Sequence, residues 1–140
     1  MTDWRMYALG SAFFAGLTAI LAKIGVKDVS SNFATFIRTL VILLFLTVLV
    51  GWRHEWENPL ALNRKSLVFL LFSGLATGLS WLCYFRALQI GPASLVAPID
   101  KLSLIFTVVF AVAFLGEHLS GIQWMGTLLM TTGALMLVLK

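Results

Sequence analysis

Two charged side chains, Asp100 and Arg38, stand inside long apolar stretches of the sequence. Counted at about 1.5 Å per residue from Ala93, Asp100 lies on the order of 10 Å deep, against about 15 Å for half of a bilayer's hydrocarbon. A short carboxylate cannot reach the headgroups from there, so it requires a partner, a cavity or a proton. Arg38, about 8 Å deep, and Lys101 can extend to the surface. Asp100 is therefore the leading functional candidate, and a structural ion pair with Arg38 or Arg86 is the alternative.

Polar side chains also recur at helical spacing near these charges. At about 100° per residue, four hydroxyls fall within an arc of roughly 60°, with Trp81 beside them: Ser73, Thr77, Ser80 and Tyr84. A second face carries Asp100, Ser103, Thr107 and Ala111, while Lys101 points about 100° away. Such faces line a cavity, or they form bonds between helices of typically under about 1 kcal/mol each. The candidate substrate-binding residues are Arg38, Thr77, Ser80, Trp81, Tyr84, Asp100, Lys101, Ser103 and Thr107.

Pro98 lies two residues before Asp100. A proline inside a helix frees the carbonyl four residues earlier, here that of Ser94, and favours a break in the span just before Asp100. Broken helices place free backbone groups around the substrates of many transporters. The sequence therefore predicts a half-helix end close to the carboxylate.

Positive charges outnumber negative ones toward one end of the spans. Four cations lie on that side, opposed by Asp100 alone: Lys23, Arg38, Arg86 and Lys101. A net positive cavity favours a ligand with a carboxylate or phosphate, including a zwitterionic amino acid. The alternative is that most of these side chains extend to water and never meet a ligand.

The elements that must position these residues are transmembrane helices. The chain has 140 residues, of which 60% are hydrophobic and 11% charged, with a mean hydropathy of +0.97. This composition excludes a soluble globular domain, a disordered segment and a disulfide scaffold. We expect an all-α membrane protein with one domain, residues 1–140, and five spans near residues 6–22, 33–52, 67–88, 93–115 and 122–139.

Several other site types find no support in the sequence. The single Cys83 permits no internal disulfide, and the spread-out charge, formally +4, contains no basic run for nucleic acid. His54 and His118 belong to loops, so we expect no metal site and no cofactor. No nucleophile constellation is visible either, so an enzyme is not expected.

The last span carries a start signal and a small-residue stripe. Ser120 can accept from a free backbone amide while Gln123 reaches back, so this helix should begin near Gly121. Its stripe allows another helix to approach closely: Gly126, Met130 and Gly133.

The Lys and Arg count gives no clear orientation. Arg5, Arg53, Arg64 and Lys65 fall on the amino-terminal side, and Lys23, Lys27, Arg86 and Lys140 on the other. Orientation normally follows an excess of these residues on cytoplasmic loops. Dual topology is one interpretation. The others are that Arg38 tips the balance or that a partner fixes the orientation.

Three segments resemble the EamA domain of the drug/metabolite transporter superfamily: Tyr84 to Ser94, Ala97 to Leu102, and Phe114-Leu115-Gly116-Glu117 followed by Leu119-Ser120. Ala34 to Arg38 is similar to the family's arginine-bearing start of the second helix. The resemblance implies one five-helix half of an inverted-repeat transporter, usually found as two fused copies that form an exporter of metabolites or amino acids.

With one copy, the resemblance implies a homodimer in the cell (inner) membrane, for which an antiparallel arrangement is one form and the stripe of the last span is the expected seam. The expected function is a secondary transporter, in the export direction, of a small metabolite such as an amino acid or organic anion. Its expected partners are the small-molecule substrate, the lipid bilayer and a second copy. The alternative is a non-transporting membrane subunit that stabilises or regulates a partner protein.

Overall fold

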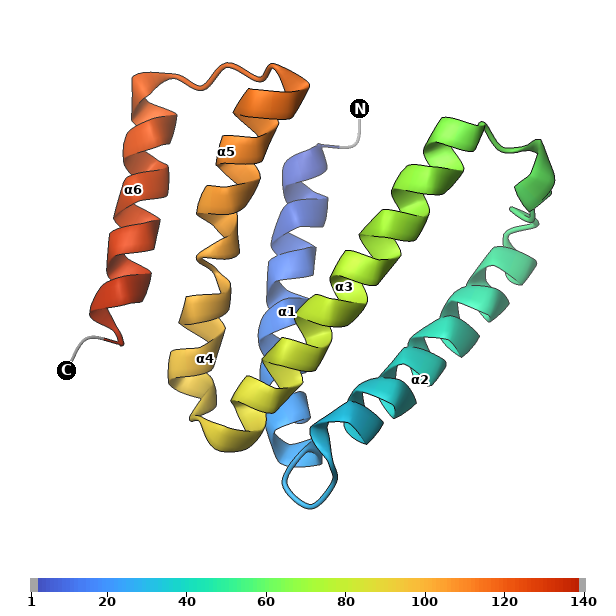
Figure 1. Cartoon of the computed structure of the whole chain (residues 1–140), viewed down its shortest axis with the longest axis horizontal. Coiled ribbons are helices and arrows are strands. Elements are labelled where there is room, and N and C mark those ends of the chain that lie inside the picture. Colours follow the sequence, from blue (N-terminus) through green and yellow to red (C-terminus); the bar gives the residue numbers. More distant parts are fainter. Residues whose placement is uncertain (1–2, 139–140) are drawn as a thin grey trace. The chain divides into compact units, whose positions relative to one another are not determined.

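The structure of the protein, a computed structural model, describes residues 3–138 except for the side chain of Leu60. Helices account for all of its regular secondary structure within those residues (Figure 1). Their bounds are α1 Trp4–Gly25, α2 Ser31–Trp52, the short 3-10 turn η1 Pro59–Ala61, α3 Arg64–Ile90, α4 Ala93–Asp100, α5 Ser103–Leu115 and α6 Gly121–Met136.

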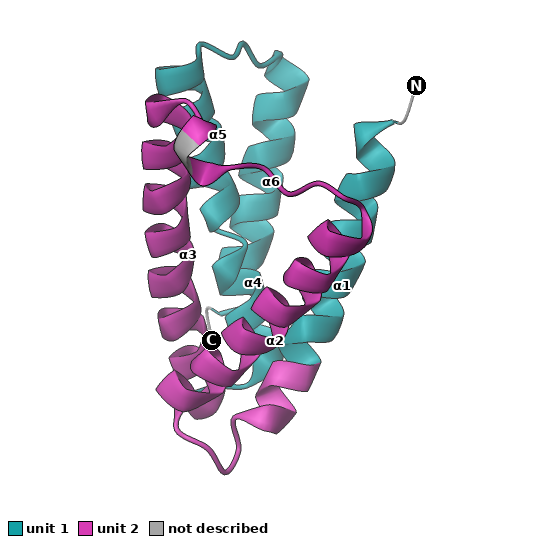
Figure 2. Cartoon of the chain, turned by 90° about the vertical axis from the view of Figure 1, so that its right-hand side faces the viewer, with its two compact units in different colours: residues 1–20, 91–140 teal, residues 21–90 magenta. Residues whose placement is uncertain are grey.

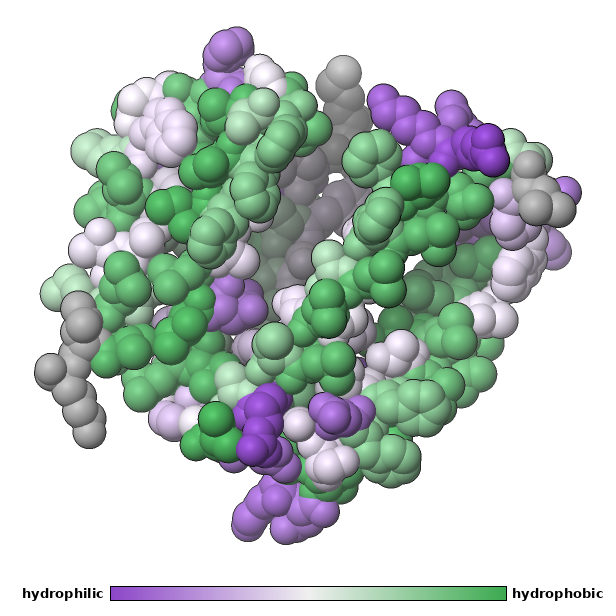
Figure 3. All heavy atoms as spheres, in the orientation of Figure 1, coloured by the Kyte–Doolittle hydropathy of each residue, from purple (hydrophilic) through white to green (hydrophobic). Residues whose placement is uncertain are grey.

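Four helical stretches among the described residues are long and apolar enough to cross a bilayer. They are α1, α2, α3 and the combined stretch Ala93–Leu115. The fifth expected span corresponds to α6, which has 16 residues, while the last residue of its expected range lies outside the described residues. Large apolar side chains are exposed along these helices, and Figure 3 shows hydrophobic residues over much of the visible surface. The chain is therefore a multi-pass membrane protein, because such side chains require lipid or another helix around them.

The helices group into two compact units (Figure 2). The first unit comprises residues 1–20 and 91–140, in which α6 packs against α4 and α5. The second unit comprises residues 21–90, in which α2 packs against α3. The most deeply buried side chains, Val26 and Leu88, belong to the second unit.

Helix ends follow local sequence signals. The Ser120 backbone N–H donates to Gln123 Oε1 at 2.7 Å, and the Gln123 N–H donates to Ser120 Oγ at 3.4 Å. This capping box starts α6 at Gly121, which confirms the predicted start. At the end of α5, Gly116 adopts the left-handed conformation with φ of 68°, which a glycine enters without a Cβ penalty. The Leu-Gly-Glu segment therefore acts as a helix stop.

The fourth expected span, residues 93–115, is divided. The first part, α4, ends at Asp100, and α5 begins at Ser103. Between them the chain tightens, because the N–H groups of Lys101 and Leu102 donate to the carbonyls of Pro98 and Ile99, at 3.1 and 2.9 Å. The expected break near Pro98 is thus present, but it follows Asp100 rather than preceding it.

Candidate functional site

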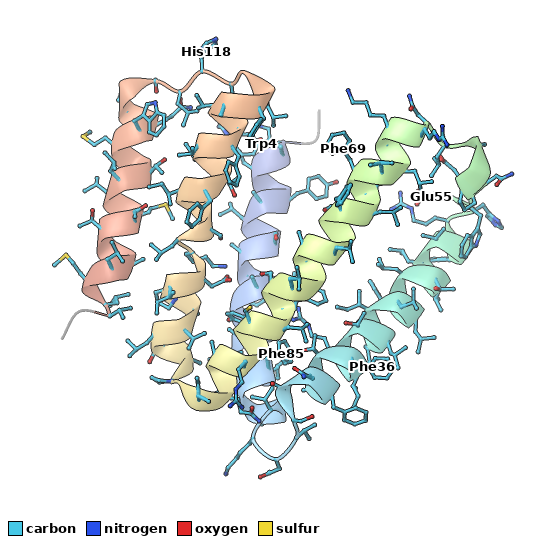
Figure 4. The ribbon with its side chains drawn as sticks, in the orientation of Figure 1. Trp4, Phe36, Glu55, Phe69, Phe85 and His118 are labelled. Carbon is cyan, nitrogen blue, oxygen red and sulfur yellow. The ribbon has the colours of Figure 1, made fainter. Side chains whose placement is uncertain are left out.

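Arg38 lies on an aromatic surface in the second unit. Its Cζ is 4.1 Å from the ring centroid of Trp81 and 5.3 Å from that of Phe85, which is cation–π distance. Arg38 is half-buried and also interacts electrostatically with Tyr84. Figure 4 shows Phe85 on the part of α3 that lies toward the start of α2. The structure therefore brings together three of the predicted site residues, Arg38, Trp81 and Tyr84.

The N–H donors of Arg38 have no acceptor in the part of the chain that the structure describes. No hydrogen bond or ion pair joins its nitrogens to any residue between positions 3 and 138. A guanidinium carries five N–H donors, and contact with a ring does not supply the oxygen acceptors that these donors take. Arg38 is therefore a positioned cation with free donors.

The hydroxyl face of α3 lies beside the face that packs on α2. Buried Phe85 and Leu88 mark the packed face, whereas Ser73, Thr77 and Ser80 are exposed within their unit. The Thr77 hydroxyl donates to the Ser73 carbonyl at 2.9 Å. Its proton is thus engaged inside the helix, and its oxygen remains an acceptor.

Asp100 is paired with its neighbour in the first unit. Lys101 Nζ lies 3.3 Å from Asp100 Oδ2, and both side chains are at least one-third exposed, at 59% and 36%. A continuous helix would separate these residues by about 100°. Residues 101 and 102 keep right-handed helical dihedrals in a tightened turn, so the length of the lysine side chain lets Nζ reach the carboxylate across that offset. The pair also differs from the considered partners of Asp100, Arg38 and Arg86.

Two further predicted site residues follow the break. Ser103 opens α5, and the Thr107 hydroxyl donates to the Ser103 carbonyl at 2.9 Å. Both residues are exposed within the first unit. Thr107 is therefore bonded like Thr77, with its proton engaged and its oxygen available.

A side-chain clasp that the sequence did not suggest ties the ends of α1 and α3 in the second unit. Lys23 Nζ donates to the Leu88 carbonyl at 2.6 Å, and Gln89 Nε2 donates to the Val29 carbonyl at 3.0 Å. Arg86 Nη1 in turn donates to Gln89 Oε1 at 2.7 Å. The clasp, defined by Lys23, Gln89 and Arg86, places two of the four expected cavity cations on neutral acceptors.

The predicted dimer seam on α6 does not face its own bundle. Thr127 and Ala134 are buried in the first unit, whereas Gly126, Met130 and Gly133 are exposed. A Cβ added at Gly126 or Gly133 would meet nothing within 4 Å. This stripe is therefore open to lipid or to another chain.

The loops contain no metal-binding arrangement among the residues at positions 3–138, where no group of three or more His, Cys, Asp or Glu side chains could hold an ion. Figure 4 shows His118 on the loop between α5 and α6 and Glu55 on the segment after α2. Glu55 pairs with Arg53, at 3.0 Å from Oε1 to Nε, with both side chains exposed.

Comparison with known proteins identifies the family of the chain. A Sinorhizobium protein described as an uncharacterized transporter in the cobO 3′ region is 48% identical over 135 residues, which cover 96% of each chain. An uncharacterized protein of Methanocaldococcus jannaschii is 28% identical over 127 residues, which cover 90% of this chain and 89% of the relative. No solved structure matches. The model of the EamA-like transporter family matches residues 3–139, and the chain belongs to that family.

Proposed function

We propose that this protein is a secondary transporter that exports a small metabolite, such as an amino acid or organic anion, across the cell (inner) membrane. The observation that carries the proposal is the break between α4 and α5, at which a half-exposed Asp100–Lys101 pair stands inside a membrane-length stretch. Transporters place broken helices and ionisable groups at such depths because a polar substrate needs partners there. Membership of a transporter family supports the same function over an enzymatic one.

The working unit in this proposal is a homodimer, with the two copies antiparallel. One EamA-like unit spans residues 3–139, whereas inverted-repeat transporters bind substrate between two repeats. The exposed Gly126, Met130 and Gly133 stripe on α6 supplies a surface on which a second copy can approach closely. The even Lys and Arg count supports insertion in both orientations.

The direct test is reconstitution of the purified chain into liposomes. Vesicles loaded with a panel of amino acids, organic anions, amines and sugars should release at least one of them, and a pH gradient should change the rate if a proton is coupled. The matched control is the Asp100→Asn variant in the same lipid. Absence of release for every compound, from vesicles that contain correctly folded protein, would favour the alternative of a non-transporting membrane subunit.

A further inference from the structure

We propose that the N–H donors of Arg38 bind a single carboxylate, so that the ligand of this site is a small monocarboxylate. Trp81 is the residue that positions the Arg38 side chain. This inference rests on the proposed function only in assigning that ligand as cargo. The binding site itself stands on the second unit, in which Arg38 and Trp81 both lie.

The first step is that the helices of the site provide Arg38 with no anion. Neither α2 nor α3 contains an Asp or Glu, and Arg38 has no hydrogen-bond partner within residues 3–138. A half-buried guanidinium whose donors are unused is costly in an apolar environment. An external anion that reaches Arg38 therefore gains both charge pairing and hydrogen bonds.

The second step concerns geometry. Contact at 4.1 Å from the Trp81 centroid and 5.3 Å from the Phe85 centroid limits the rotation of the guanidinium. The in-plane N–H groups then form a fork that matches the two oxygens of a carboxylate. Because the fork is held before a ligand arrives, less conformational entropy is lost on binding.

The third step selects a monoanion. A dianionic phosphate needs a second cation that donates to it, and the two cations of the clasp, Lys23 and Arg86, already donate to other groups. Lys23 donates to the Leu88 carbonyl and Arg86 to Gln89 Oε1. One carboxylate pairs with Arg38 alone, whereas a dianionic phosphate would have to draw Lys23 or Arg86 away from its present acceptor.

A further group of the ligand has an available partner one helical turn away. Thr77 lies four residues before Trp81, about 40° around α3, and its oxygen can accept because its proton is engaged with Ser73. A carboxylic acid that also carries an ammonium group, such as an amino acid, therefore fits the same site. A comparison of isovalerate with L-leucine, which adds the ammonium group, tests whether this second group is required.

The test is protection of Arg38 from phenylglyoxal, a reagent that modifies guanidinium groups, in the full-length chain with peptide mass spectrometry as the readout. The probes are acetate, isovalerate, phenylacetate and L-leucine as monocarboxylates, with isoamylamine and inorganic phosphate as controls. At tenfold its Kd, a bound monocarboxylate should slow modification of Arg38 by about tenfold. Arg5, which stacks on Trp4 with a centroid distance of 5.6 Å, is the matched internal control and should not be protected.

Two results would overturn the proposal. One is that no monocarboxylate slows modification of Arg38, and the other is that phosphate protects it as well as they do. Protection by isovalerate alone supports the proposal, and so does protection by both isovalerate and L-leucine. The difference in protection between these two probes shows whether the ammonium group contributes to binding.

Variants separate the fork from the charge. Arg38→Lys keeps the charge but loses the planar fork, so the affinity for the protecting carboxylate should fall by about tenfold or more. Arg5→Lys is its control. Trp81→Leu should weaken binding by about fivefold, and Trp81→Phe should restore most of it, because a ring face is what holds Arg38. Unchanged affinity in Arg38→Lys would contradict the proposal even if Trp81→Leu failed to fold.

Flux measured on the same preparations distinguishes this inference from the proposed function. Protection of Arg38 without release of any compound from vesicles would leave the carboxylate site standing and remove the transporter. Release of a compound that lacks a carboxylate, at a rate that Arg38→Lys does not change, would support the transporter. It would contradict the assignment of a monocarboxylate as its cargo.

Discussion

At the scale of single residues, the pairing of Asp100 depends on where a helix ends. Its partner Lys101 is the next residue, 3.3 Å away, and both side chains are partly exposed. The pair joins two adjacent residues of one stretch, so the carboxylate is not explained as a fastening between helices. Its place at a break in a membrane-length stretch favours a role in substrate or proton handling.

The Asp100→Asn variant tests that role. Because Asn keeps the size and loses the charge, the protein should fold normally and lose transport in reconstituted vesicles. Folding is checked by circular dichroism and size-exclusion chromatography, and flux is measured with the compound found for the unmodified chain. A folded variant with full flux would refute the role of Asp100.

The Thr77 and Thr107 hydroxyls show what periodicity predicted and what it did not. Their faces were identified from spacing alone, and both are exposed within their units. Each hydroxyl donates to the carbonyl four residues earlier rather than to another helix. Donation of this kind is a local choice of rotamer, and spacing carries no information on it.

At the scale of elements, side chains hold the ends of α1 and α3 together. A side chain of α1 donates to a carbonyl of α3, and a side chain of α3 donates to a carbonyl in the turn after α1. Lys23 supplies a cation at the C-terminus of α3, where the helix dipole favours positive charge. Gln89 supplies an amide to the carbonyl of Val29 in the turn after α1. The clasp therefore satisfies carbonyls that would otherwise remain open at two helix ends.

Removing the clasp should destabilise the second unit. Lys23→Met loses a charge-assisted hydrogen bond, so the free energy of unfolding should fall by about 1 to 3 kcal/mol. Thermal unfolding in detergent, followed by circular dichroism, measures the change. Lys27→Met, which removes an exposed lysine from the adjacent turn, is the control and should have little effect. Equal effects of the two substitutions would contradict the clasp.

The break between α4 and α5 should depend on Pro98. With Pro98→Ala, residue 98 regains an N–H that can donate to the Ser94 carbonyl, which favours a continuous helix. We expect stability to rise by about 1 to 3 kcal/mol and transport to decrease, because the half-helix end is lost. Unfolding and flux are measured on the same preparation. A variant with undiminished flux would show that the break is not needed for transport.

At the scale of the whole molecule, the exposed α6 stripe predicts how two copies meet. In a C2 dimer with antiparallel α6 helices, Met130 faces its counterpart and Gly126 faces the partner's Gly133. In a cysteine-free background made by Cys83→Ala, the Met130→Cys variant should form a disulfide-linked dimer. The Gly126→Cys variant alone should not. Coexpression of Gly126→Cys with Gly133→Cys should restore the crosslink.

Nonreducing electrophoresis of membranes reads out these pairs. Thr127→Cys, at a position buried in its own unit, is the control that should remain monomeric. Crosslinking of Gly126→Cys with itself would indicate a parallel seam. No crosslink at any of the three stripe positions would refute the seam.

The sequence determined the helical class, the approximate spans, the capping box that starts α6 and the faces on which polar residues gather. These features are local: they depend on runs of apolar residues and on partners three or four positions apart. Of the five expected spans, four are supported by membrane-length stretches among the described residues, and the fifth corresponds to the 16-residue α6.

Tertiary structure decided which faces meet and which donors are engaged. Lys23 reaches the Leu88 carbonyl across 65 positions of sequence, Gln89 reaches that of Val29 across 60, and Arg38 of α2 stacks on Trp81 of α3. In a helix that is apolar on most sides, the sequence does not indicate which side packs against another helix. The reason is that lipid and protein solvate an apolar face almost equally well. Contacts between distant residues therefore follow from packing, and only their geometry shows that Lys23 is bound to a carbonyl while the donors of Arg38 have no acceptor among the described residues.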